Sequence, residues 1–280
     1  MTTNQMSVVS YIKQDAVVQR VNELLKDRAP QFLTTLSTAI NESQKLAECE
    51  PKSVLTAALT AAGLDLSVNP NLGFAYLIPY NKKAKVTDEK GKTQWINTTV
   101  CQFQIGYKGF IQLAQRSGFY KTINATDVRE GEIKRFDRLS GEIEFEWIDD
   151  LQERNQTPVI GYVAYFKLLN GFEKMSYMSA EELESHARKY SKSYAKYSDG
   201  LWKDDFDSMA KKTVLKLLIS KYGPQSTQMQ DAIKGDQMID NEYADNPNTV
   251  IMENAEIGSS EEMPDGQEED INNNDNKEDK

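Results

Sequence analysis

Apolar residues recur every three or four positions through the first 63 residues of the chain. Valine and leucine carry this repeat within residues 11–28, a second repeat follows Pro30, and a third, rich in alanine and leucine, runs from Pro51 to Gly63. The spacing predicts three amphipathic helices, because it gathers apolar side chains on one helical face. These faces form either part of the core or a subunit interface, since three helices precede any sheet and need a surface to cover.

After Leu64 the helical repeat gives way to turns and then to extended segments. Residues 74–80 and 99–105 are predicted strands, and the second of them places Cys101, Phe103 and Ile105 on one face. The residues between the strands, NKKAKVTDEKGKTQW, are polar and contain five lysines. This segment is either a long hairpin tip that reaches a phosphate backbone or a solvated loop.

Residues 106–119, GYKGFIQLAQRSGF, predict a helix bounded by glycines. Its apolar stripe consists of Tyr107, Phe110, Ile111, Leu113 and Ala114. The opposite face carries Lys108, Gln112, Gln115 and Arg116. A helix that buries one side and presents cations and amides on the other can lie along a phosphate backbone.

The second half of the chain predicts an antiparallel sheet followed by helices. Strands are expected at residues 121–129, 143–147, 159–169 and 172–178, and Asn170-Gly171 between the last two is a strong hairpin signal. Ser179-Ala-Glu-Glu182 is a capping box that opens a helical region, which ends at Gly223-Pro224. The fold class that follows is α+β, with an antiparallel sheet and a long hairpin packed against helices.

The net charge of -10 is unevenly distributed. Residues 225–280 contain 16 acidic and 3 basic residues, or 3 - 16 = -13, which leaves 30 basic and 27 acidic residues, or +3, in residues 1–224. Residues 225–280 are poor in aromatic residues and are predicted to be a disordered acidic tail. The tail could compete with a ligand of the basic part of the chain, dock a partner protein or only increase solubility. Residues 1–224 are the expected folded domain, with residues 1–63 mainly helical.

Cysteine content and hydropathy indicate a cytoplasmic protein. Cys49 and Cys101 form no Cys-x-x-Cys motif, and free thiols are expected. The N-terminal residues lack the pattern of a signal peptide, and no apolar run approaches the length of a membrane span.

The residues offer little for catalysis, and no catalytic residue, metal or cofactor is expected. His186 is the single histidine, and no Gly-x-Ser-x-Gly motif is present. Gly91-Lys92-Thr93 resembles the end of a phosphate-binding loop, but Val86 stands where that loop requires glycine. A metal-dependent nuclease is an alternative, because Asp127, Glu132 and Lys134 resemble the carboxylate pattern that holds Mg²⁺.

Basic and aromatic residues recur together in three separate segments, which favours nucleic-acid binding. Cations track phosphates independently of sequence, and aromatic rings stack on unpaired bases. Lysine dominates over arginine, so recognition of the backbone of single strands with little sequence preference is expected. The candidate DNA-binding residues are Lys82, Lys83, Tyr107, Lys108, Gln112, Arg116, Lys121, Arg188, Lys189, Lys192, Lys196, Trp202, Lys211, Lys212 and Lys216. Tyr190, Tyr194 and Tyr197 alternate with the cations of the second half.

Three blocks carry a resemblance to a known family. In order they are GLDLSVNPNLGFAYLIPY, QIGYKGFIQLAQRSG and WKDDFDSMAKKTVLKLLISKYG, and together they resemble the RecT single-strand annealing proteins of phages and prophages over residues 30–224. The central block matches the family at Lys108, Gln112 and Arg116, and the last block matches it at Trp202, Asp205, Lys211, Lys212 and Lys216.

The resemblance implies a core similar to the Rad52-like annealing fold, an antiparallel sheet with helices, and makes residues 1–224 the DNA-binding and oligomerisation domain. It also implies a function and partners for the chain. RecT proteins anneal complementary DNA strands without ATP, assemble into rings or helical filaments and act with a partner exonuclease. The implied partners are therefore single-stranded DNA, annealed duplex, further copies of the chain, a phage exonuclease and the host single-strand-binding protein. The alternatives to annealing are the nuclease and a phage particle assembly protein whose N-terminal helices form the lattice.

Overall fold

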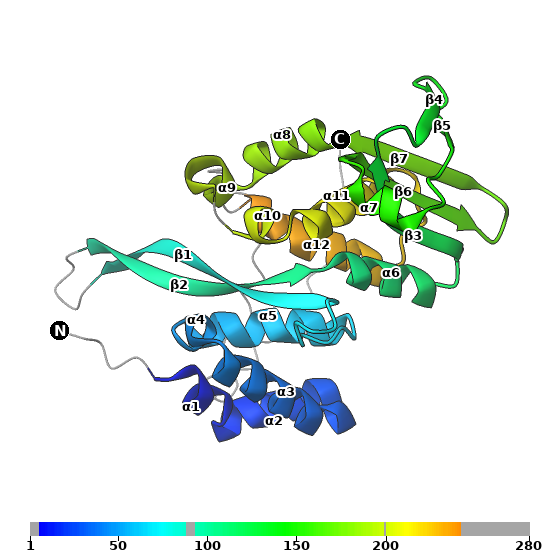
Figure 1. Ribbon diagram of the computed structural model, residues 1–280. Coiled ribbons are helices and arrows are strands. Elements are labelled where there is room, and N and C mark those ends of the chain that lie inside the picture. The colour runs from blue at the N-terminus through cyan, green and yellow to red at the C-terminus, as the bar shows by residue number, and fades with distance from the viewer. Residues whose placement is uncertain (1–5, 88–92, 199, 242–280) are drawn as a thin grey trace, which may run out of the picture. The chain divides into compact units, whose positions relative to one another are not determined.

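The computed structural model describes residues 6–87, 93–198 and 200–241. Within these ranges the chain begins with helices, as predicted (Figure 1). They are α1 (Val8–Ile12), α2 (Asp15–Leu25), the short 3₁₀ helix η1 (Lys26–Arg28), α3 (Ala29–Glu42), α4 (Gln44–Ala47) and α5 (Pro51–Gly63). The single helix predicted for residues 11–28 is therefore divided. Lys26 ends α2 with a positive φ of 49°, a conformation that a helix interior does not contain.

A long antiparallel hairpin follows these helices. It consists of β1 (Ala75–Thr87) and β2 (Thr93–Ile105), paired from Ala75↔Ile105 to Thr87↔Thr93. Both predicted strands are confirmed, but each continues well into the polar lysine-rich segment. The inner half of the hairpin lies on α5, where Ser53 Oγ accepts a hydrogen bond of 2.9 Å from the backbone N–H of Cys101. The N-terminal helices thus cover a surface of their own chain.

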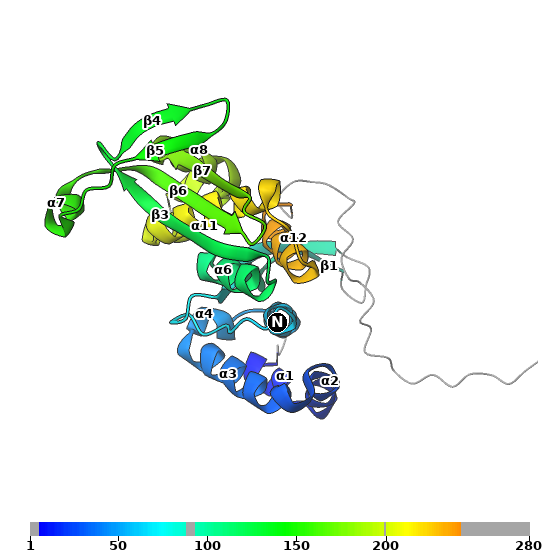
Figure 2. The same cartoon turned by 90° about the vertical axis from the view of Figure 1, so that its right-hand side faces the viewer.

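The second sheet has three antiparallel strands in the order β3-β6-β7 (Figure 2). They are β3 (Tyr120–Arg129), β6 (Val159–Leu168) and β7 (Glu173–Ser179), and the β6–β7 turn contains Gly171 with a φ of 90°, as the hairpin signal predicted. A smaller hairpin of β4 (Ile133–Asp137) and β5 (Glu142–Phe145), followed by α7 (Leu151–Gln156), is inserted between β3 and β6. The strand β4 and the helix α7 were not predicted.

Helices pack against this sheet. The chain continues with α8 (Ala180–Tyr190), α9 (Lys192–Tyr197), α10 (Leu201–Asp204) and α11 (Phe206–Tyr222). The capping box of Ser179 and Glu182 opens α8 as predicted. The helix α11 packs against all three strands and against α6 (Tyr107–Arg116), and it buries Val214, Leu218 and Ile219. None of the helices in the described part of the chain is long and apolar enough to cross a membrane.

The predicted start of the disordered tail is wrong. Residues 227–241 form a helix, α12 (Thr227–Asn241), which contacts β2 and α6. This helix buries Met229, Ala232 and Ile233 in the same hydrophobic core as the helices and sheets before it. These three residues lie at helical spacing on one face, so a composition averaged over the acidic segment concealed the helix. The remainder of the predicted tail, residues 242–280, lies outside the described residues.

Two glycines place α6 against the start of β1. A Cβ atom on Gly106 would lie 2.2 Å from the carbonyl oxygen of Gly73, and one on Gly109 would lie 2.2 Å from that of Phe74. The backbone N–H of Gly106 also donates a hydrogen bond of 2.9 Å to Phe74. These glycines therefore allow two backbones to approach closely. Because the two backbones approach so closely, Lys108 lies beside the residues that lead into the hairpin.

Candidate nucleic-acid interface

Aromatic and charged side chains gather where α6, β1 and the start of α11 meet. The exposed Lys108 lies with its aliphatic stem next to Gly73, beside the hydroxyl of Tyr76. Burial raises the pKa of Tyr76 above its ordinary value, and the nearby Asp205 and Tyr107 raise it further. Tyr107 and Tyr76 are half-buried, and Tyr107 packs against the hydrophobic core. We call these residues, Tyr76, Tyr107, Lys108 and Asp205, the α6 cluster.

The other polar residues of α6 contribute less to an open surface. Gln112 is half-buried. Arg116 donates hydrogen bonds of 3.0 and 2.8 Å to the carbonyl oxygens of Leu64 and Asp65 and lies 3.7 Å from the Asp65 carboxylate. Its guanidinium therefore fastens the turn after α5 to α6. Arg116 therefore has a structural role, and the phosphate contact expected from the sequence stays a prediction.

The segment of α8 and α9 carries a second group of cations and tyrosines. Residues 186–198 contain four cations and no carboxylate. The charged group of Arg188 lies 5.4 Å from the ring centre of Tyr194, that of Lys189 lies 5.0 Å from Tyr190, and that of Lys196 lies 5.0 Å from Tyr197. We call these six residues the α8–α9 patch.

Two of the three rings of the α8–α9 patch are exposed to a ligand, whereas Tyr194 is half-buried against the core. Tyr190 and Tyr197 keep 47% and 67% of their surface exposed. Each ring therefore offers a face for stacking next to a cation that can reach a phosphate. Arg188 also pairs with Glu184 at 2.7 Å, a surface ion pair that salt screens and that contributes little to stability. The side chain of Lys192 lies outside the described residues.

The candidates on α10 and α11 are mostly structural, which corrects the sequence-based expectation. Trp202 is only 6% exposed and packs against Phe206 with ring centres 5.5 Å apart, so it is not placed to stack on a base. Lys212 is also buried, and its Nζ lies 2.6 Å from Asp236 of α12. Lys216 contacts the same carboxylate at 2.7 Å. This corrects the expectation that Lys212 and Lys216 are open to DNA, because the Asp236 carboxylate of α12 pairs with both ammonium groups.

Three further candidates lie at separate places. Lys211 is half-buried and pairs with Asp207 at 2.7 Å. Lys121 is exposed at the start of β3, and Lys82 is exposed on β1. The side chain of Lys83 lies outside the described residues. Lys211, Lys121 and Lys82 belong to α11, β3 and β1, and none of them is a member of the α6 cluster or the α8–α9 patch.

The carboxylates that suggested a nuclease form a buried ion-pair network. Arg154 lies 2.7 Å from Glu132 and 3.2 Å from Asp127, and Arg129 lies 2.7 Å from Asp127. Burial alone raises the pKa of Asp127, but the hydrogen bond from Arg129 and the charges of Arg154 and Arg129 bring it below its ordinary value. Within the described ranges, no three histidine, cysteine or acidic side chains are grouped to hold a metal ion. The network instead fastens α7 to the sheet.

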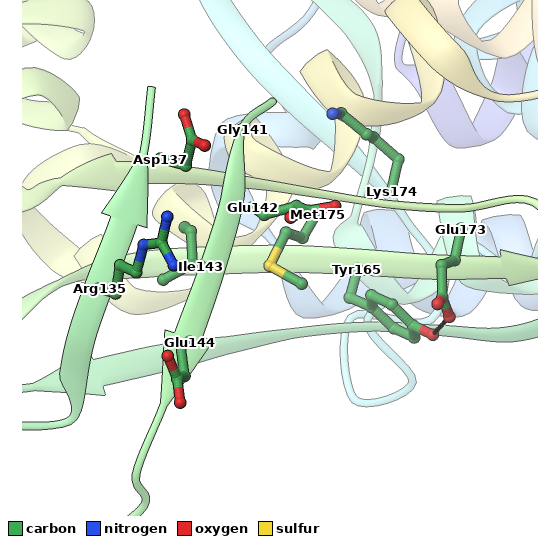
Figure 3. A pocket seen from close by; sticks show the side chains of 10 residues that line it. All are labelled: Arg135, Asp137, Gly141, Glu142, Ile143, Glu144, Tyr165, Glu173, Lys174 and Met175. Atoms are coloured by element: carbon green, nitrogen blue, oxygen red, sulfur yellow. Dashed lines mark hydrogen bonds between the residues drawn. The ribbon is translucent and has the colours of Figure 1, made fainter. Parts of the chain in front are cut away.

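A hollow of about 560 Å³ lies between the β4–β5 hairpin and the strands β6 and β7 (Figure 3). Most of its charged lining is acidic, from Asp137, Glu142, Glu144 and Glu173. Tyr165 donates a hydrogen bond of 2.5 Å to Glu173, and Lys174 bonds to the carbonyl oxygen of Ser140. Carboxylates repel phosphate, so this hollow does not fit a nucleic-acid backbone.

Two aromatic residues of the β1–β2 hairpin, Tyr76 and Trp95, are not among the DNA-binding candidates predicted from the sequence. Tyr76 was read only as part of a strand, and its position beside Lys108 depends on the approach of α6. Trp95 on β2 keeps 68% of its surface exposed. A single tryptophan within a lysine-rich polar segment was the available sequence signal for it.

The chain is similar in sequence to a known protein family and to two known proteins. The sequence profile of the RecT family matches residues 30–250 of the chain. A protein of Bacillus subtilis (strain 168) named "Uncharacterized protein YqaK" is 42% identical over 218 residues, which cover 78% of this chain and 68% of that protein. "Protein RecT" of Escherichia coli (strain K12) is 29% identical over 232 residues, which cover 82% of this chain and 80% of that protein.

Proposed function

Because this chain belongs to the RecT family, which supports a role in single-strand annealing during recombination, we propose that it binds single-stranded DNA and pairs it with a complementary strand without ATP. The observation that carries the proposal is the grouping of cations with exposed tyrosines in the α8–α9 patch, together with Lys108 and two tyrosines in the α6 cluster. Both surfaces offer charge for phosphates and rings for bases.

In the proposed mechanism the protein binds the DNA strands, and base pairing selects the complementary one. Cations of the two surfaces neutralise the phosphates of one strand, and the tyrosines hold its bases unpaired. A second strand is retained only where it forms Watson–Crick pairs with the first. Pairing therefore reads the sequence, and the protein needs no contacts to base edges. Annealing is downhill in free energy, so no nucleotide has to be hydrolysed, and we assign no catalytic residue.

The proposed partners follow from the same mechanism. They are single-stranded DNA, the annealed duplex, and further copies of this chain in a ring or helical filament. An exonuclease would supply the single strands, and the host single-strand-binding protein would occupy them first. The N-terminal helices α1 to α3 are the proposed contact between subunits, since part of their surface, including Leu24, is exposed.

The proposal is tested by mixing two complementary oligonucleotides with the purified full chain in the absence of ATP and metal ions. Duplex formation at moderate salt should be faster than the spontaneous rate. Adding Mg²⁺ to labelled DNA should leave its length unchanged. A rate equal to the spontaneous one would refute annealing, and loss of labelled DNA in Mg²⁺ would support the nuclease.

A charge variant tests the surface. We expect Lys108→Glu to weaken binding to oligonucleotides of unrelated sequence by similar factors, because a phosphate contact carries no sequence information. The slope of log K against log salt should become shallower by about 0.7, the value for one single-strand phosphate. Lys134→Glu, on the exposed β4–β5 hairpin, is the matched control and should leave both quantities nearly unchanged. Equal effects of the two variants would remove Lys108 from the interface.

A further inference from the structure

We propose that the outer half of the β1–β2 hairpin is an additional contact for single-stranded DNA, where the indole of Trp95 stacks on a base. The inference rests on the proposed function and extends it to a segment that neither the α6 cluster nor the α8–α9 patch includes. The carrying observation is a large exposed aromatic side chain, that of Trp95, on this paired ribbon.

The hairpin has two halves that differ in burial. The inner half contributes buried side chains, among them Leu77, Cys101 and Phe103. Beyond Pro79 on β1 and Cys101 on β2, none of the side chains whose burial is described belongs to the core. Backbone pairing nevertheless continues to Thr87↔Thr93. An isolated two-stranded hairpin is only marginally stable in water. A ligand that covers the outer half of this hairpin would therefore stabilise it.

Trp95 is the most exposed of the three tryptophans. It keeps 68% of its surface exposed, whereas Trp202 is 6% exposed. Trp147 is 43% exposed, but its ring is stacked on Phe145 with centres 4.7 Å apart. An indole in water exposes a large apolar face, and a base is a flat apolar surface that can cover it.

The charge around Trp95 identifies the ligand. In the register of the hairpin Trp95 lies directly opposite Lys85. The paired segments 81–87 and 93–99 contain three lysines and no carboxylate. Lysine is depleted in contacts between proteins, whereas lysine combined with an aromatic ring is typical of single-strand binding sites. We therefore favour a nucleic acid over a second copy of the chain as the occupant of this ribbon.

Fluorescence offers a direct test with the full-length protein. Addition of poly(dT) should quench part of the tryptophan emission of the wild type, and this quenching should be largely absent in Trp95→Phe. The matched control Trp147→Phe should keep the quenching, because that ring is already stacked within the protein. This comparison does not depend on affinity, provided that each variant is saturated with DNA.

Affinity for labelled poly(dT) is the second measurement. Trp95→Ala should weaken binding about 5-fold to 100-fold, the range expected for loss of one stacked base. Trp95→Phe should remain within about 3-fold of the wild type, because it keeps an aromatic face. Neither substitution should change the melting temperature appreciably, since the ring packs against no core. An unchanged melting temperature would show that a loss of affinity does not come from unfolding.

The outcomes separate this inference from the proposed function. If the wild type binds poly(dT) but Trp95→Phe is quenched equally and Trp95→Ala binds equally, the inference is overturned and the proposed function stands. If Trp95→Ala instead lowers the molar mass of the DNA-free protein in light scattering, the ribbon contacts a second copy, which also overturns the inference. If the wild type does not bind poly(dT), the proposed function fails and the inference fails with it.

Discussion

Removal of the Asp236 carboxylate should destabilise the fold strongly. This group is 4% exposed and lies 2.6 Å from Lys212 and 2.7 Å from Lys216, so one anion offsets two cations between α11 and α12. Breaking a buried ion pair by deleting one partner typically costs about 3–5 kcal/mol, because the remaining charge stays in a poorly solvated place. For a domain of this size each kcal/mol lowers the melting temperature by about 2–4 °C. We therefore expect Asp236→Ala to melt about 6–20 °C below the wild type.

The same carboxylate predicts a pH dependence of the free energy of unfolding. Burial by itself raises the pKa of Asp236, but the charges of Lys212 and Lys216 outweigh it and hold that pKa below the ordinary value. A group whose pKa is lower in the folded state stabilises the fold above its unfolded pKa, about 3.9 for aspartate. This contribution is lost as the pH falls from there through the lower folded value. The gap between wild type and Asp236→Ala should therefore be constant at neutral pH and narrow below about pH 4.

The assay is thermal and urea unfolding of the full chain, with Asp231→Ala as the matched control. Asp231 is exposed on the same helix, so its removal should change stability by less than about 0.5 kcal/mol. Replacing the ion cluster as a whole, with Lys212→Met, Lys216→Met and Asp236→Leu together, should recover much of the loss, because no buried charge then remains. Equal melting temperatures for Asp236→Ala and Asp231→Ala would refute the reasoning.

Two further predictions concern close packing and burial. Gly109→Ala should destabilise the protein by several kcal/mol, because its Cβ would lie 2.2 Å from the carbonyl oxygen of Phe74. The control Gly63→Ala, with nothing within 4 Å of the added Cβ, should be nearly neutral. Equal melting temperatures of the two variants would contradict the close approach of the two backbones. Burial raises the pKa of Cys49 to about 11 and raises that of Cys101 as well. Iodoacetamide at neutral pH should therefore alkylate both thiols far more slowly in the native protein than in urea, because the thiolate is the reactive form. Equal rates, measured by mass spectrometry, would show that the thiols are accessible.

The elements with local signals were predictable from the sequence. Alternation marked the inner parts of β1 and β2, the capping box marked the start of α8, and glycines bounded the helix that became α6. Each signal depends on residues a few positions apart, which is the range over which propensity and periodicity act. The outer parts of the two strands were not predicted because polar residues dominate them, with Ala84, Val86, Trp95 and Ile96 as their few apolar residues. The helix α12 was missed because its three buried side chains are surrounded by an acidic segment.

The roles of individual cations depended on partners distant in the sequence. Lys212 and Lys108 read alike in the sequence, as lysines on helices with an apolar face. The first is buried because Asp236 approaches from a helix 24 residues further along, and the second is exposed beside Tyr76. Arg116 likewise meets carbonyl groups more than 50 residues away, at the end of α5.

The sequence by itself determined that this chain belongs with the annealing proteins, that its class is α+β and that its cations cluster with aromatic residues. Periodicity, turn chemistry and composition are properties of neighbouring residues, so they can be read without coordinates. Only the tertiary structure decided which of those cations face solvent. Exposure depends on what packs against a side chain, and a buried lysine is stable only where a carboxylate from another element reaches it.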